Sequence, residues 1–135
     1  MKVQRVDSLN FPSLENRLGF SGLDNWVSVI HDIYDYKIHR LVVLDDSQPL
    51  GALSLVEVKH PVFGHYLVTA PFGSYGGFAF ESHAARDLLL EETSRLAEET
   101  KVEYAAIRFE EGESIPPANW IQQPSYYTYL IDLSH

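Results

Sequence analysis

The chain of 135 residues contains no cysteine, and this absence removes several kinds of chemistry. Without cysteine there is no disulfide, no thiolate metal ligand and no cysteine nucleophile. Six histidines are present, but a zinc site needs several ligands at close spacing, and the neighbouring pair His60 and His65 has no obvious third ligand. We therefore expect no metal site.

Long apolar segments are also missing. None approaches the roughly 20 residues that a membrane-spanning helix needs, and the start, Met1–Asp7, lacks the apolar core of a secretory signal peptide. We expect a cytoplasmic protein without a membrane span.

Basic residues are scarce, with 10 Lys and Arg against 19 Asp and Glu, which gives a formal charge of −9. A protein that coats DNA or an anionic membrane needs Lys and Arg to neutralise phosphates, so DNA is not an expected partner. Ten acidic and four basic residues fall between Glu81 and Glu113, and we interpret this run as a solvated helix face. The length suits one domain, residues 1–135, with a real hydrophobic core.

Hydrophobic periodicity and turn residues predict the order of the elements. Strands are expected over residues 2–6, 38–44, 50–58, 65–70, 103–109 and 125–133, and helices over 21–34 and 83–99. Ser21 and Ser82 are the expected N-caps. The apolar stripe expected on the first helix consists of Trp26, Val29, Ile30, Ile33 and Tyr34.

The second expected helix lies between two strands, which indicates a βαβ crossover and at least one parallel strand pair. The three strands before it follow one another through short turns and are expected to form an antiparallel meander. Gly51 is expected to mark a bulge or a close backbone approach. The predicted fold class is therefore α/β (α+β), with a mixed, mostly antiparallel sheet flanked by helices.

A glycine-rich stretch, Pro71–Ala79 (PFGSYGGFA), lies between the third strand of the meander and the second helix. Glycine lets backbone N–H groups approach a ligand closely, and a helix N-terminus favours negative charge. A plain connection without a ligand is the alternative. Ser74 follows Gly73 directly, so the Gly-x-Ser-x-Gly pattern of a serine nucleophile is missing.

Several stretches are similar to FemAB-like acyltransferases. The segment Val62–Gly77 (VFGHYLVTAPFGSYGG) resembles the part of that family that runs from an "lfG" turn through a strand to "Pf..YGG". Gly51 and Leu53–Leu55 resemble its "ivGvlPL" strand, with Ser54 in place of proline. Residues 97–108 resemble "lA...gv.yielR", residues 126–133 resemble "y.Tf.ldL", and the similarity spans roughly residues 23–133 in register.

FemAB-like proteins contain two GNAT-like acyltransferase domains in tandem, and the resemblance implies that this chain is similar to the first. Peptidoglycan members of that family transfer an amino acid from aminoacyl-tRNA to an amine of a cell-wall precursor, and other relatives are linked to exopolysaccharide. The resemblance implies an N-acyltransferase-type domain acting on an amine-bearing cell-envelope precursor. It implies acyl-CoA or aminoacyl-tRNA as co-substrate and no tightly bound cofactor. A second GNAT-like domain or a homodimer would complete the cleft.

The residues expected to bind the acyl donor or the substrate are Ser74, Tyr75, Gly76, Gly77, Ala79, Arg108 and Tyr126. Ser74–Ala79 also fits the Arg/Gln-x-x-Gly-x-Gly/Ala spacing with which GNAT acetyltransferases hold the pyrophosphate of acetyl-CoA, with Ser74 in place of Arg or Gln. Backbone N–H groups would still contact an anion there. No catalytic base is assigned. A non-catalytic binding or dimerisation module and a conventional acetyl-CoA-dependent N-acetyltransferase are the alternative functions.

Overall fold

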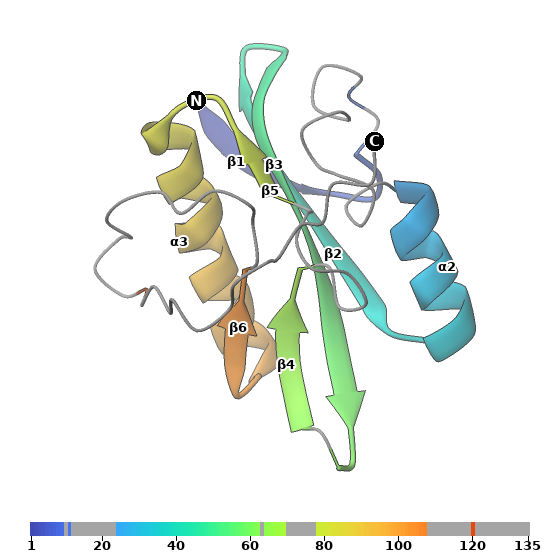
Figure 1. Cartoon of the computed structure of the whole chain (residues 1–135). Coiled ribbons are helices and arrows are strands. Elements are labelled where there is room, and N and C mark those ends of the chain that lie inside the picture. The colour runs from blue at the N-terminus through green and yellow to red at the C-terminus, as the bar shows by residue number, and fades with distance from the viewer. Residues whose placement is uncertain (10, 12–23, 63, 70–77, 108–119, 121–135) are drawn as a thin grey trace, which may run out of the picture.

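The computed structural model describes residues 1–9, 11, 24–62, 64–69, 78–107 and 120, and all statements below concern these residues (Figure 1). In chain order the elements are β1 (Lys2–Val6), α2 (Asp24–Tyr34), β2 (Lys37–Asp45), β3 (Gln48–His60), β4 (Gly64–Val68), β5 (Phe78–Phe80), α3 (His83–Thr100) and β6 (Tyr104–Ala106). The strand expected over 125–133 and the cap expected at Ser21 lie outside the described residues.

Six strands form one sheet in the order β1-β2-β3-β4-β6, and β5 pairs with β3. The pairs β1–β2, β2–β3, β3–β4 and β3–β5 are antiparallel, and β4–β6 is parallel, with Tyr66 opposite Tyr104. Helix α3 connects the β4–β5 side of the molecule to β6, so the predicted crossover and its parallel pair are confirmed. The two helices flank the sheet (Figure 1), which confirms the predicted fold class.

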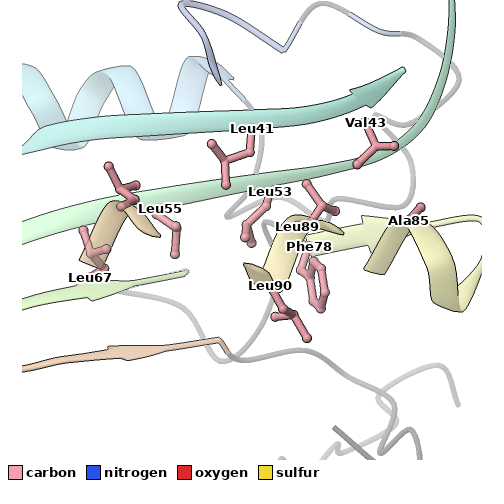
Figure 2. Close-up of a cluster of buried hydrophobic side chains, with 10 residues drawn as sticks. Leu41, Val43, Leu53, Leu55, Leu67, Phe78, Ala85, Leu89 and Leu90 are labelled. Atoms are coloured by element: carbon pink, nitrogen blue, oxygen red, sulfur yellow. The ribbon is translucent and has the colours of Figure 1, made fainter. Parts of the chain in front are cut away.

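The main hydrophobic core lies between α3 and one face of the sheet (Figure 2). Alternate residues of β2 and β3 point toward the helix because successive strand side chains face opposite sides. Burial of these aliphatic side chains is the main driving force for docking α3. The buried cluster consists of Leu41, Val43, Leu53, Leu55, Leu67, Phe78, Ala85, Leu89, Leu90 and Leu96.

Helix α3 begins and ends with recognisable caps. The Ser82 hydroxyl accepts a hydrogen bond from the Ala85 backbone N–H at 3.2 Å, so the predicted N-cap is confirmed. At the other end Lys101 has a left-handed conformation (φ 58°), and its N–H bonds to the Ala97 carbonyl. Glu91 and Glu98 are exposed, as the interpretation of the acidic run requires.

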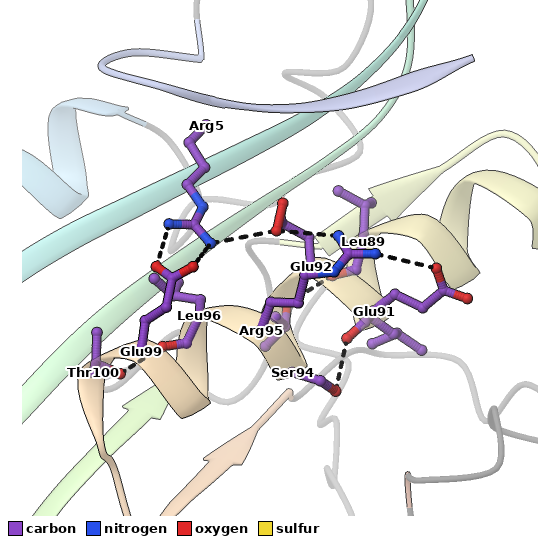
Figure 3. Close-up of polar contacts among 11 residues, drawn as sticks. Arg5, Leu89, Glu91, Glu92, Ser94, Arg95, Leu96, Glu99 and Thr100 are labelled. Carbon is purple, nitrogen blue, oxygen red and sulfur yellow. Dashed lines mark hydrogen bonds and ion pairs between the residues drawn. The ribbon is translucent and has the colours of Figure 1, made fainter.

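An ion-pair cluster ties β1 to the exposed side of α3 (Figure 3). Arg5 Nη1 donates to Glu99 Oε2 at 2.7 Å, and Arg5 Nη2 lies 3.3 Å from Glu92 Oε1. Arg95 also contacts Glu92, at 3.3 Å, and lies 4.0 Å from Glu91 in an i,i+4 pair. The hydrogen bond from Arg5 holds the pKa of the Glu99 carboxyl below its ordinary value.

The opposite face of the sheet carries two smaller apolar clusters. One contains Leu9, Val42, Ala52 and Ala79, and the other contains Ile30 of α2 with Val56, Val58 and Val68. The helix buries Val27 and Ile30, whereas Val29, Ile33 and Tyr34 are exposed. The predicted stripe is therefore correct at Ile30 and wrong at Val29, Ile33 and Tyr34, because α2 turns its Val27–Ile30 side toward the sheet. The side chain of Trp26 is outside the described part of the structure.

The β2–β3 hairpin explains why a glycine occupies position 51. The register shifts between Val43 and Leu44, and Pro49, expected in the turn, pairs with Leu44 inside the strands. A Cβ atom at Gly51 would lie 3.1 Å from the Ala79 carbonyl oxygen and 3.1 Å from Leu89 Cδ1. Both the bulge and the close backbone approach expected there are confirmed.

Candidate functional site

Most of the predicted ligand-binding residues lie outside the described part of the chain. These are Ser74, Tyr75, Gly76, Gly77, Arg108 and Tyr126, and their roles stay predictions. Ala79 is described: it lies in β5 opposite Ala52, with its side chain buried. The expectation that the glycine-rich loop extends through Ala79 was wrong, because Phe78 and Ala79 alternate toward the two cores and pair with β3.

The described elements next to the predicted loop in the sequence are β4 before it and β5 and α3 after it. Thr69, which follows β4, donates its backbone N–H to the Ala106 carbonyl at 3.2 Å, so the parallel pair β4–β6 continues to this level. After β5, helix α3 begins at His83, and its first turn contains no acidic residue. The carboxyl ends of parallel strands and the start of a helix are places where α/β folds bind anionic ligands.

Arg86 is a buried cation in the first turns of α3, and it was missed from the sequence. The residue is 8% exposed. Its Nε and Nη2 atoms each lie 3.0 Å from Asp87 Oδ1. Buried arginine is rare unless it is paired, and the sequence signal was an arginine next to Ala85 on the apolar side of the helix. Arg86 and Asp87 therefore form an ion pair in the first turns of α3, in which the two charges balance.

Two strands, β4 and β5, pair with the same edge of β3. Along β3, Ala52 pairs with Ala79 of β5 and Val56 pairs with Val68 of β4. Ser54, between them, has no strand partner on this side within the residues that the structure describes. Residues 70–77, which connect β4 to β5 and contain the predicted loop, lie outside the described residues.

A second polar cluster joins three strands at the other end of β4. His39 Nε2 lies 2.8 Å from Glu57 Oε1, and His65 Nε2 lies 2.7 Å from Glu57 Oε2. Burial by itself raises the pKa of the Glu57 carboxyl, but the hydrogen bonds from His65 and His39 outweigh it, so the pKa is below its ordinary value. An ionised carboxylate only accepts hydrogen bonds, so both imidazoles carry a proton on Nε2.

This cluster was also missed from the sequence, where His65 was considered only beside His60. The missing information was the register, which brings β2 and β4 to the two sides of β3. Among the described residues, no group of three or more His, Cys, Asp or Glu side chains is arranged to hold a metal ion. In the same part of the chain, no helix combines the length and apolarity that crossing a bilayer requires.

Comparison with known proteins gives a match at the level of the fold. No family model matches the sequence, and no curated protein matches it. A solved structure described as that of "a probable acetyltransferase" matches with a TM-score of 0.53 and 12% sequence identity, over 100% of this chain and 99% of that chain. At this identity the likeness concerns the fold alone. It agrees with the predicted GNAT-like fold class, whereas the FemAB-like ancestry stays a prediction.

Proposed function

We propose that the chain is an N-acyltransferase-type domain that binds an acyl donor beside the glycine-rich stretch 71–77. The observation that carries the proposal is the parallel β4–β6 pair, because β4 precedes the glycine-rich stretch in the chain and β5 and α3 follow it. Backbone N–H groups of Tyr75, Gly76 and Gly77 and the start of α3 would supply positive potential for donor phosphates.

The chemistry would be attack of a neutral amine on the activated acyl carbon. A C–N bond forms, the bond from the acyl carbon to its leaving group breaks, and the leaving thiolate or alkoxide is neutralised by the proton that the nitrogen loses. Catalysis would come from positioning and from hydrogen bonds to the oxyanion that develops on the acyl oxygen. The proposed first contacts are Ser74 and the loop N–H groups, followed by Arg108 and Tyr126.

Charge favours acyl-CoA over aminoacyl-tRNA as the donor. Binding tRNA requires many phosphates to be neutralised, whereas this chain carries a formal charge of −9. CoA presents few phosphates, and one helix start suits it better. The FemAB-like resemblance adds the finer proposal that the acceptor is an amine of a cell-envelope precursor.

The first experiment measures donor binding and acyl transfer. Acetyl-CoA and aminoacyl-tRNA are titrated separately, and release of the CoA thiol or of free tRNA is followed with muropeptides as acceptors. Gly77→Val should abolish donor binding because a branched side chain blocks close approach of the backbone to phosphate. Absence of binding by both donors, together with an unaffected Gly77→Val variant, would refute the proposal.

A charge-gain variant gives a sharper test with a matched control. Ser74→Arg restores the arginine of the acetyltransferase pattern and should tighten acetyl-CoA binding about tenfold, equivalent to roughly 1.4 kcal/mol. Ser47→Arg adds the same charge at an exposed turn position on the β2–β3 hairpin and should leave the affinity unchanged. Equal effects of the two variants would indicate nonspecific charge attraction instead of a donor site.

A binding or dimerisation module is the second candidate, and one observation favours it. Helix α2 exposes Val29, Ile33 and Tyr34, of which Ile33 is 68% exposed. Sedimentation of the wild type and of Ile33→Glu tests this function. A concentration-dependent dimer that Ile33→Glu dissociates, without any donor binding, would favour the module over the enzyme.

A further inference from the structure

The four tyrosines that the structure describes form two stacked pairs on the α2 side of the sheet. Tyr34 stacks on Tyr36 with ring centroids 5.7 Å apart, and Tyr66 of β4 stacks on Tyr104 of β6 at 4.9 Å. Tyr36 and Tyr66 both pack against the apolar cluster that contains Ile30 of α2. The other ring of each pair is open to solvent, with Tyr34 49% exposed and Tyr104 52% exposed.

The two tyrosine pairs lie on different sides of the sheet's width. Tyr36 directly precedes β2, whereas Tyr104 belongs to β6, and β3 and β4 lie between these two strands. Three strand spacings separate β2 from β6, which is roughly 14 Å. Helix α2 packs mainly on β2, and the β6 side of the sheet lies away from it (Figure 1). Tyr104 is therefore left exposed on the side that α2 covers less.

Helix α2 has a second apolar side that does not face its own sheet. Val29 is 44% exposed and Ile33 is 68% exposed, and residues four apart lie on the same side of a helix. Four of the six large hydrophobic residues that the described structure exposes are on α2 or are Tyr104, so these residues are concentrated and not scattered singly. Concentrated apolar side chains on a surface are typical of an interaction site.

The distribution of charge favours a second copy of the chain as the partner of this surface. The chain has a formal charge of −9, but its described strands contain only two acidic residues, Asp45 and Glu57. Asp45 ends β2 near the N-terminal amine, and Glu57 points away from the α2 side because it alternates with Val58. Two copies therefore meet here with little repulsion, whereas the exposed Glu91 and Glu98 of α3 would repel their copies.

Twofold symmetry makes the exposed side of α2 and the Tyr66–Tyr104 pair complementary to each other. In a symmetric dimer every contact between two different patches occurs twice. An axis that runs between two copies along the strand direction exchanges the β2 side of the sheet with the β6 side. It places α2 of each copy over the Tyr66–Tyr104 pair of the other. Both contacts form together, so the dimer is closed and leaves neither patch open for a third copy.

We propose that two copies of the chain form a symmetric dimer in which Val29 and Ile33 of each α2 pack on the Tyr66–Tyr104 pair of the other. Tyrosine combines a large apolar ring with a polar tip and is enriched at protein interfaces. Stacking on Tyr66 holds the Tyr104 ring in place, so little side-chain freedom is lost on docking. The inference goes beyond the proposed acyl transfer and does not depend on it.

The first test is analytical ultracentrifugation of the full chain from micromolar to millimolar concentration. We expect a reversible dimer that Ile33→Glu and Tyr104→Glu each weaken at least tenfold, because each buries a charge in an apolar contact. Ser47→Glu is the matched control: it adds the same charge at an exposed turn position and should leave dimerisation unchanged. A wild-type chain that stays monomeric, or a dimer that Tyr104→Glu does not weaken, would overturn the proposal.

The absence of cysteine allows a second test that reports which residues meet. Ile33→Cys and Tyr104→Cys chains are mixed in equal amounts and treated with a short bismaleimide, and the linked products are identified by mass. We expect the mixed product to exceed both products that link identical chains, because the axis brings position 33 of one copy to position 104 of the other. Glu98→Cys, on the exposed side of α3, replaces Tyr104→Cys as the control and should show no such excess. Equal yields with both mixtures would refute the proposed contact.

Donor binding is measured on the same samples, so that the dimer and the acyltransferase proposal fail separately. A wild-type chain that binds acetyl-CoA as a monomer at every concentration refutes the dimer and leaves the acyltransferase proposal standing. A dimer that shows the expected cross-link but binds neither acetyl-CoA nor aminoacyl-tRNA supports the interface and refutes the acyltransferase proposal.

Discussion

The Glu57 carboxylate accepts a hydrogen bond of 2.7 Å from the His65 ring, which joins the end of β3 to the start of β4. Its other oxygen accepts a hydrogen bond from His39 on β2, so one carboxylate links three neighbouring strands. Lys37 lies directly opposite Glu57, and Lys59 lies directly opposite His65, so two further basic residues belong to the same rows. The ionised form of Glu57 is therefore the one that the fold stabilises.

Glu57→Gln should destabilise the protein at neutral pH and much less in acid. The pKa of Glu57 is lowered on folding, so its contribution is present above the pKa of the unfolded chain, about 4.5, and disappears as pH falls through the lower folded value. We expect a loss of about 2 kcal/mol at pH 7, the size of a hydrogen bond to a charged group. Denaturant unfolding at pH 7 and pH 3 measures it. A loss that stays constant with pH would contradict this account.

Two adjacent glutamates on α3 provide a comparison of paired and unpaired charge. Arg5 donates two hydrogen bonds to Glu99, at 2.7 and 3.1 Å, whereas Glu98 is exposed. Glu99→Gln should lower the melting temperature slightly more than Glu98→Gln at low ionic strength. The difference should vanish in 1 M salt, because exposed ion pairs are screened. Equal melting temperatures at low salt would show that the Arg5 pair adds nothing to the docking of β1.

The sequence predicted the elements of the sheet well because their signals are local. The apolar runs of β2 and β3, the cap at Ser82 and the apolar side of α3 are properties of a few neighbouring residues, and each has a physical cause that acts before the chain folds. The parallel β4–β6 pair also followed from element order, since a helix between two strands requires a crossover.

The features that were missed depend on contacts between distant residues. Whether Val27 or Val29 of α2 is buried depends on how the helix rotates against β2 and β3, and the periodicity of a short apolar helix does not fix that rotation. The Glu57 cluster and the cross-strand pair of Arg40 and Ser54 depend on the strand register. Strand β5 has only three residues, too few for a clear alternation, and it exists because Phe78 and Ala79 complete two cores.

The candidate site was predictable only as a location. The glycine-rich stretch and the element order together indicate where α/β folds bind ligands. The topology of the described strands and helices agrees with that location. The buried polar residues Arg86 and Ser54 both follow apolar residues in the sequence, and Arg86 is followed by Asp87, its ion-pair partner. Their burial depends on contacts with neighbouring strands and helices, and the local sequence does not determine those contacts.

Gly64→Ala should destabilise the turn between β3 and β4 for two separable reasons. Gly64 has a φ of +95°, which side chains rarely adopt, and a Cβ atom there would lie 2.6 Å from Glu103 Oε2. We expect a loss of at least about 1 kcal/mol. Combining it with Glu103→Ala removes the clash and leaves the backbone strain, so the double variant should lose less than the sum of the single ones. Additive losses, measured by denaturant unfolding, would show that the Glu103 side chain simply moves aside.

Ser82 separates the stability of α3 from its proposed attraction for a donor. Ser82→Ala removes the acceptor for the Ala85 N–H and should cost about 1 kcal/mol. Ser82→Asp keeps a capping oxygen and should restore the stability, but it places a negative charge at the helix start. Acetyl-CoA affinity should therefore follow the order serine, alanine, aspartate, whereas the melting temperature should place alanine last. Calorimetric titration and thermal unfolding of the three proteins measure the two orders. An aspartate variant that binds acetyl-CoA as tightly as the wild type would place the donor phosphates away from the start of α3.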